Sequence, residues 1–118
     1  FIAPGHAICQ HPSGADDPNA DTLQEIETTL RRAGLEVTTI PSPGLVKDED
    51  GNPIPASHMN FTITNGAVLV PVYEDRYSLV AQAELSALFE GRKVIGLPAR
   101  NILNGGGSFH CMTREIPA

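Results

Sequence analysis

A four-part pattern occurs twice along this chain: an amphipathic helix, a glycine, a short strand and a proline. The glycine and proline are Gly34 with Pro41 in the first copy and Gly91 with Pro98 in the second. Glycine ends a helix because it adopts the left-handed conformation at no steric cost, and proline ends a strand because it has no N–H to donate. Units repeated at this length bury a common core by stacking on their neighbours. The chain is therefore predicted to be an α+β protein built from two related units.

Hydrophobic periodicity predicts the elements within each unit. They are a strand over His6–Gln10, a helix over Asp21–Ala33, a strand over Leu35–Ile40, hairpin strands over Phe61–Thr64 and Ala67–Val70, a helix over Ser78–Phe89 and a strand over Lys93–Leu97. The apolar faces are predicted to hold Leu23, Ile26, Leu30 and Ala33 in the first helix and Leu79, Ala83, Leu85, Leu88 and Phe89 in the second. Asp21 is a candidate N-cap. Asn65-Gly66 predicts a tight hairpin turn in which both residues have positive φ.

Length and charge limit the class of protein. At 118 residues without tryptophan, the chain is sufficient for one modest core. A net charge of −6, with eight scattered Lys and Arg residues, argues against nucleic acid or an anionic membrane as the main partner. No apolar run is long enough to cross a membrane, and we expect a cytoplasmic protein. Because it starts at Phe1 without methionine, we expect a piece of a longer chain.

The chemistry is concentrated near the end of the chain, where three glycines precede Ser108, Phe109, His110 and Cys111. A cysteine attacks as its thiolate, and glycines let backbone N–H groups approach a site closely. In an extended segment His110 and Cys111 would face opposite sides, so the base for Cys111 is expected elsewhere. The alternative is that Cys111 is a small buried residue on a terminal strand.

These residues carry a resemblance to a known family. The segment from Gly105 to Thr113 resembles the C-terminal signature of agmatine deiminases and the related Porphyromonas-type peptidylarginine deiminases. The similarity extends over nearly the whole chain, through Phe1–Gly5, Ala56–Phe61, Asn65–Pro71, Leu88–Arg92, Val94–Gly96, Ala99–Leu103 and Pro117-Ala118.

That resemblance implies the pentein fold, an α/β propeller of five ββαβ units that surrounds an active-site channel. The chain would supply about the last two, over residues 1–60 and 61–118, as the C-terminal portion of the deiminase domain. It implies that Cys111 attacks the guanidinium carbon of agmatine through a covalent thiouronium, giving N-carbamoylputrescine and ammonia without a cofactor. Gly106, Gly107, Ser108 and Asn60 would contact substrate. The catalytic histidine and carboxylates would precede residue 1, so the piece alone is expected to be inactive and to need the missing N-terminal part of its fold or self-association.

Several alternatives remain open from the residues themselves. Asn60 is either near the active site, as the resemblance implies, or a local backbone cap. His6, Cys9 and His11 suggest a metal cluster, but no second pair completes tetrahedral ligation, so we expect no metal. The acidic loop residues are solvated charges or substrate contacts; they are Asp16, Asp17, Asp48, Glu49 and Asp50.

The substrate also stays open. Ser108, Phe109, Met112 and Arg114 depart from the agmatine deiminase pattern, and His-Cys-Met-Thr also resembles the ending of arginine deiminases and amidinotransferases. A noncatalytic half-propeller used for binding or assembly is the alternative from another functional class.

Overall fold

The computed structural model describes residues 1–73, 76–114 and 116. Its elements follow in the order β1 (His6–His11), α1 (Ala20–Arg32), β2 (Glu36–Pro41), β3 (Thr62–Ile63), β4 (Ala67–Val72), α2 (Arg76–Leu88), β5 (Lys93–Pro98), α3 (Arg100–Leu103) and α4 (Phe109–Met112). The predicted strands and long helices are all present, with ends that differ by one or two residues. The second half has the ββαβ order, and the first half contains its βαβ part.

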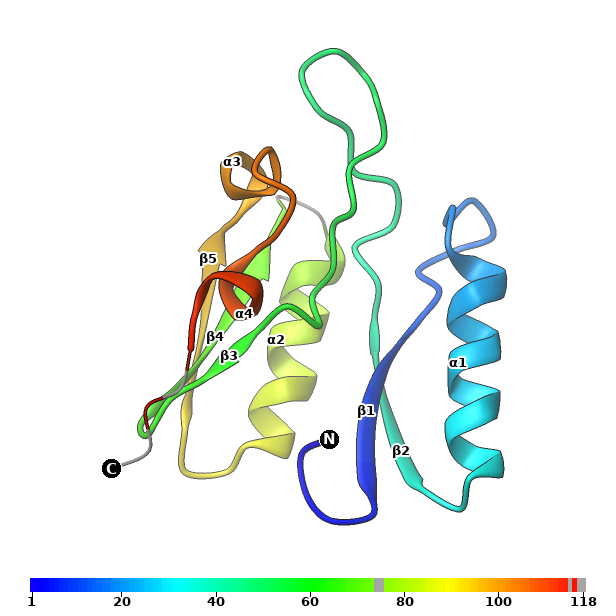
Figure 1. Ribbon diagram of the computed structural model, residues 1–118, viewed down its shortest axis with the longest axis vertical. Helices are drawn as coiled ribbons and strands as arrows, with labels where there is room; N and C mark the ends of the chain where they lie inside the picture. The colour runs from blue at the N-terminus through cyan, green and yellow to red at the C-terminus, as the bar shows by residue number, and fades with distance from the viewer. Residues whose placement is uncertain (74–75, 115, 117–118) are drawn as a thin grey trace.

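The elements form two small sheets with α2 between them (Figure 1). β1 and β2 pair in parallel, with His6 opposite Glu36 and His11 opposite Pro41. In the other sheet β4 is central, antiparallel to β3 and parallel to β5. α1 covers the outer face of the β1–β2 pair (Figure 1). The helix of the second unit therefore joins the two units.

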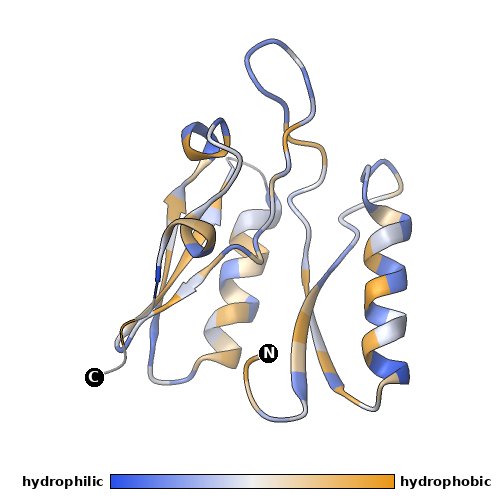
Figure 2. Cartoon of the chain, in the orientation of Figure 1, coloured by the Kyte–Doolittle hydropathy of each residue, from blue (hydrophilic) through white to orange (hydrophobic). Residues whose placement is uncertain are grey.

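The main core lies where both sheets meet α2. It is formed by Ile8, Ile40, Phe61, Val68, Val70, Ala81, Leu85 and Phe89. Figure 2 shows hydrophobic residues along β1, β4 and α2, whereas the long loop that follows β2 is mostly hydrophilic. Phe61 and Phe89 meet edge to face at 5.8 Å between ring centroids, a favourable geometry for aromatic rings. The two halves thus share one core, as expected for stacked units.

Glycines end both long helices as predicted, with φ of +79° at Gly34 and +84° at Gly91. The predicted cap of α1 was wrong, because Asp21 lies inside the first turn and Asn19 occupies the cap position without a side-chain hydrogen bond. Asp17 holds this end instead, since its Oδ1 accepts from the Asn19 N–H at 2.9 Å. A carboxylate upstream of the helix therefore takes the place of a cap.

The hairpin between β3 and β4 is confirmed, but its predicted turn geometry was wrong at Gly66, whose φ lies outside the left-handed region. The Thr64 hydroxyl closes the turn by accepting from the Ala67 N–H at 3.1 Å and donating to the Ala67 carbonyl at 2.9 Å. The Gly66 carbonyl accepts from the Lys93 N–H at 3.0 Å. Pairing with β5 thus continues into the turn and holds Gly66 in it.

The predicted apolar faces of the helices were partly wrong. In α2, Leu79 is 73% exposed, and the buried residues are Ser78, Ala81 and Leu85. These three follow the spacing of one helical face, and Leu79 lies one position away from it. No residue of α1 is buried, and Ile26 is 42% exposed. No helix among the described residues is long and apolar enough to cross a membrane.

Candidate active site

Cys111 lies in a short helical turn, α4, and its side chain is exposed. The sequence-based expectations of an extended segment and of burial on a terminal strand were therefore wrong. Ser108 precedes the turn with extended backbone, and its carbonyl accepts from the Met112 N–H at 3.1 Å. The glycines before it give the chain room to reverse from α3 into α4, so the helical turn presents the thiol to the surface.

The three glycines shape this loop in different ways. Gly106 has φ of +85°, which L-residues rarely adopt. A Cβ on Gly107 would lie 3.0 Å from the Cys111 Cβ and 3.7 Å from its Sγ, so the loop backbone lies directly against the nucleophile candidate. The N–H groups of Gly105 and Gly106 donate to the carbonyls of Ile102 and Leu103 at 3.0 and 2.8 Å. These two N–H groups therefore complete α3 instead of pointing into the site.

Asn60 forms three hydrogen bonds with α4, one of them to the thiol itself. Its side-chain Nδ2 donates to the Cys111 Sγ at 3.1 Å, and its Oδ1 accepts from the Cys111 N–H at 3.1 Å. The Asn60 carbonyl also accepts from the His110 N–H at 3.1 Å. Residues 51 positions apart thus form a clamp that fixes both the position of α4 and the direction of the sulfur.

Hydrogen bonds lower the pKa of the Cys111 thiol below its ordinary value. The largest cause is the Asn60 side chain, followed by the backbone N–H of Ser108; partial desolvation opposes them, and the backbone N–H of Cys111 adds a smaller lowering. Donors favour the charged form of a thiol because they stabilise the negative sulfur. The same bonds that orient Cys111 therefore also favour its nucleophilic form.

The turn before β3, from Ser57 to Asn60, presents Asn60 to the thiol. His58 in this turn is fully buried; its Nδ1 donates to the Pro41 carbonyl at 2.8 Å, and its Nε2 lies 3.0 Å from the Ser78 Oγ. The Tyr73 hydroxyl accepts from the Ser57 N–H and donates to the Ser57 carbonyl, both at 3.2 Å. Sequence reasoning missed these supporting residues, although a histidine within the Ser57–Asn60 segment was a signal for them.

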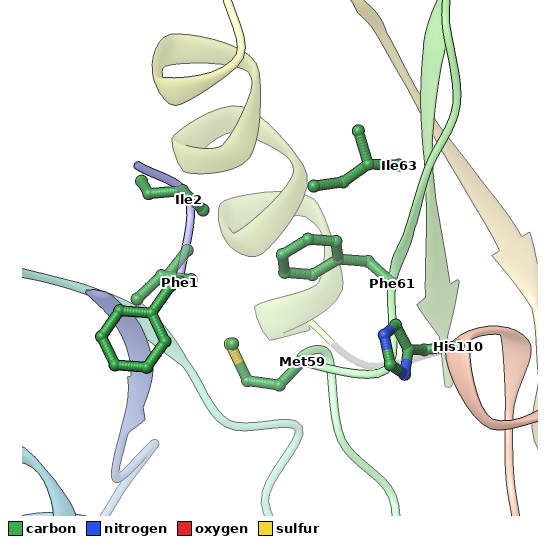
Figure 3. A pocket seen from close by; sticks show the side chains of 7 residues that line it. Phe1, Ile2, Met59, Phe61, Ile63 and His110 are labelled. Carbon is green, nitrogen blue, oxygen red and sulfur yellow. The ribbon is translucent and has the colours of Figure 1, made fainter. Parts of the chain in front are cut away.

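Within the part of the chain that the structure describes, the His110 ring forms no hydrogen bond with the Cys111 thiol, whose side-chain partner is Asn60. The His110 side chain lines an apolar pocket of about 290 Å³ (Figure 3). The pocket is lined by Phe1, Ile2, Ile8, Met59, Phe61, Ile63 and His110. A shallower hollow of about 200 Å³ adjoins it and is lined by Ser57, Met59, Asn60, His110 and Cys111. The thiol therefore opens onto a small surface hollow beside an apolar one.

The residues expected to contact substrate are placed differently from one another. Asn60 and Gly107 touch Cys111, whereas Gly106 shapes the loop from two positions before Ser108. The Ser108 side chain is fully buried, and its hydroxyl has no hydrogen-bond partner among the residues that the structure describes. Ser108 therefore contributes its backbone to the thiol, and its side chain faces the interior.

The other candidate residues lie apart from this site. His6 bonds to Thr38 at 2.8 Å, Cys9 is buried, and His11 bonds to the Pro12 carbonyl at 2.9 Å. Within residues 1–73, 76–114 and 116, no three His, Cys, Asp or Glu side chains gather as metal ligands would. Of the acidic candidates, Asp16, Glu49 and Asp50 are exposed and Asp48 is half-buried. Asp17 is 6% exposed and accepts hydrogen bonds in the loop after β1.

Relatives of this chain resemble it in sequence and in fold. Curated relatives from Selenomonas ruminantium and Latilactobacillus sakei, each named "Putative agmatine deiminase", are 31% and 30% identical over all of this chain and 38% and 39% of their own lengths. The solved agmatine deiminase of C. jejuni superposes with a TM-score of 0.86 at 28% identity, over 94% of this chain and 35% of that one. The agmatine deiminase of Enterococcus faecalis does so with a TM-score of 0.82 at 26% identity, over 93% and 36%.

The chain thus spans about two fifths of the length of its curated relatives, and it has part of the pentein fold, as the family resemblance implied. The family model for Porphyromonas-type peptidyl-arginine deiminase matches residues 1–117, which include both Asn60 and the glycine loop that carries Cys111. A match over so much of the chain, together with the shared fold, shows that this chain belongs to the Porphyromonas-type peptidyl-arginine deiminase family.

Proposed function

We propose that this chain carries the nucleophile of a hydrolase that removes ammonia from a guanidino compound, with agmatine as the leading substrate. The observation that carries the proposal is the hydrogen bond from the Asn60 amide to the exposed Cys111 thiol, which lowers the pKa of that thiol. Agmatine deiminases among the relatives support the substrate class. One solved C. jejuni agmatine deiminase, with a cysteine replaced by serine, has substrate bound.

The proposed reaction has two stages. The Cys111 thiolate attacks the guanidinium carbon, and a C–S bond forms. One C–N bond then breaks, and the departing nitrogen takes up a proton from a general acid outside residues 1–118 and leaves as ammonia, so that a thiouronium remains on the sulfur. Water attacks the same carbon and gives one proton back to that acid. The C–S bond then breaks, the new hydroxyl loses its proton to solvent, and the thiolate is restored. For agmatine the product is N-carbamoylputrescine.

Each described residue of the site has a part in this scheme. Asn60 holds the sulfur as a thiolate and directs it toward the hollow, and the Ser108 N–H adds a second donor. Gly107 allows the loop to approach the Cys111 side chain without a clash. A planar cation is held best by carboxylates, and proton transfer is commonly carried out by histidine. The proposal assigns these groups to protein outside residues 1–118.

Ammonia release from agmatine by the intact protein, with Cys111→Ala and Cys9→Ala as matched variants, tests the function. Cys9 is buried and lies outside the hollow, so Cys9→Ala should retain turnover, whereas Cys111→Ala should abolish it. Arginine and a peptidyl-arginine assayed in parallel distinguish the substrates. Persistent turnover in Cys111→Ala would exclude the mechanism. An ordinary alkylation rate and pH profile at Cys111, with no turnover of any guanidine, would favour the noncatalytic module.

A further inference from the structure

The turn that carries Asn60 is held by a side chain from the other half of the chain. Gln10 lies near the end of β1, and only 6% of it is exposed. Its Oε1 accepts a hydrogen bond from the Ser57 hydroxyl and lies 3.5 Å from the Met59 nitrogen. Both of these residues lie in the turn from Ser57 to Asn60, and Met59 directly precedes Asn60.

The bonds around Gln10 form a closed triangle. The Met59 N–H also donates to the Ser57 Oγ at 3.2 Å, so one backbone donor is shared between two acceptors. The Asn60 N–H continues the turn by donating to the Ser57 carbonyl at 3.3 Å. Since each of these bonds fixes the backbone beside Asn60, the orientation of the Asn60 amide depends on the triangle.

We propose that Gln10 is a positioning residue for the Cys111 thiol, which it orients through Ser57, Met59 and Asn60. This inference rests on the proposed role of Cys111 as nucleophile. Gln10 does not itself reach the hollow, which is lined by Ser57, Met59, Asn60, His110 and Cys111. It acts through the turn, which it ties to β1, a strand that contributes Ile8 to the shared core.

The physical reason lies in what the turn would do without Gln10. The Ser57 hydroxyl would lose its acceptor and the Met59 N–H would keep one partner in place of two. Ser57 and Met59 are half-buried, and polar groups there that lose a partner are free to shift toward new ones, including water in the hollow. A shift of a few tenths of an ångström at Asn60 lengthens its 3.1 Å bond to the sulfur, and bonds to a charged group weaken steeply with distance and angle.

His58 and Tyr73 also support the turn, but they hold its other side. His58 connects the turn to β2 and α2, and the Tyr73 hydroxyl forms hydrogen bonds with the backbone of Ser57. Gln10 differs from both because its acceptor oxygen serves the residue directly before Asn60. Replacing Gln10 should therefore change the orientation of the thiol while His58 and Tyr73 still attach the turn to the rest of the fold.

The test compares Gln10→Met with Thr38→Val in the intact protein. Methionine matches the length and volume of glutamine and lacks its acceptor. Thr38→Val removes a side-chain hydrogen bond to His6 in the same β1–β2 sheet, and His6 is the first residue of β1 whereas Gln10 lies near its other end. Alkylation of Cys111 is followed against pH by mass spectrometry of its peptide, which distinguishes it from Cys9.

Gln10→Met should move the alkylation profile of Cys111 to higher pH and slow the reaction about tenfold at neutral pH. It should lower kcat by about the same factor while KM stays within about twofold. Thr38→Val should leave both measurements at their wild-type values. Equal profiles in Gln10→Met and the wild type would overturn the proposal, because a merely structural role changes stability alone.

A double-mutant cycle with Ser57→Ala identifies the route. If Gln10 acts through the Ser57 hydroxyl, the double variant should react no more slowly than Gln10→Met alone, whereas additive effects would overturn this route. Ser57→Ala also carries the test by itself if Gln10→Met does not fold. The alkylation measurement needs no substrate. Turnover that persists in Cys111→Ala would therefore refute the proposed function, whereas the alkylation profiles of Gln10→Met and the wild type decide whether Gln10 positions the thiol.

Discussion

Replacing Gly106 or Gly91 with alanine separates the cost of a left-handed backbone from its effect on the thiol. The two glycines have φ of +85° and +84°, and a Cβ on either would meet nothing within 4 Å. Each substitution therefore carries the conformational cost alone, about 1–2 kcal/mol. At about 2.1 cal/mol/K of unfolding entropy per residue, a 118-residue cooperative unit loses about 4 °C in Tm per kcal/mol. Both variants should melt below the wild type by the same amount, which is about 4–8 °C where the 118 residues unfold as one unit and smaller where they unfold together with more protein.

The two variants should differ at Cys111. Gly106 directly precedes Gly107, which has no free space on the side of the Cys111 Cβ. A backbone that relaxes at residue 106 must therefore displace the loop against the thiol. We expect Gly106→Ala to slow alkylation of Cys111 several-fold and Gly91→Ala to leave it unchanged. Thermal melts and alkylation rates measured on the same samples check this. Equal alkylation in the two variants would refute the claim that the glycine loop sets the reactivity of the thiol.

Two further substitutions test charged groups. Asn60→Asp keeps the acceptor for the Cys111 N–H but places a carboxylate beside the sulfur. It should therefore raise the pKa of the Cys111 thiol more than Asn60→Ala does, as measured by the alkylation rate against pH. A larger rise in Asn60→Ala than in Asn60→Asp would contradict the role of Asn60 as a clamp. Burial alone would raise the pKa of Asp17, but hydrogen bonds, chiefly from Ser42, outweigh it and keep that pKa below its ordinary value. Its contribution to stability should therefore be present above about pH 4 and be lost as the pH falls through the folded-state pKa. In urea unfolding, Asp17→Asn should accordingly destabilise the protein at pH 7 and less at pH 3, and an equal effect at both would contradict this assignment.

The fold was largely predictable because local signals agreed with it. Gly34 and Gly91 end helices at positions with positive φ, where backbone geometry favours glycine, although the Asn65-Gly66 turn did not adopt its usual form. There the Thr64 hydroxyl and pairing of Gly66 with β5 outweighed the intrinsic preference of the turn. The sequence of a turn does not reveal a hydrogen bond from a neighbouring strand.

The site was predictable in its parts and less so in its arrangement. The glycines and Cys111 are close in sequence, so their association was visible from the pattern. The bonds from Asn60 to Cys111 and from Gln10 to the turn join residues that are 51 and 47 positions apart. Gln10 gives no local signal of its role, because a buried amide in a strand acquires a partner only through the tertiary fold. Cys111 was expected in an extended segment because the helical turn of α4 is only four residues long.

The most direct test of the account is whether Cys111 becomes covalently attached to substrate during turnover. The intact protein is mixed with agmatine, quenched in acid during the first turnovers and digested, and the peptides that contain Cys111 and Cys9 are weighed. The account predicts a transient adduct of agmatine minus ammonia on Cys111, which disappears as substrate is exhausted, and none on Cys9. Ammonia release at full rate with Cys111 unmodified throughout, and equally in Cys111→Ala, would contradict it.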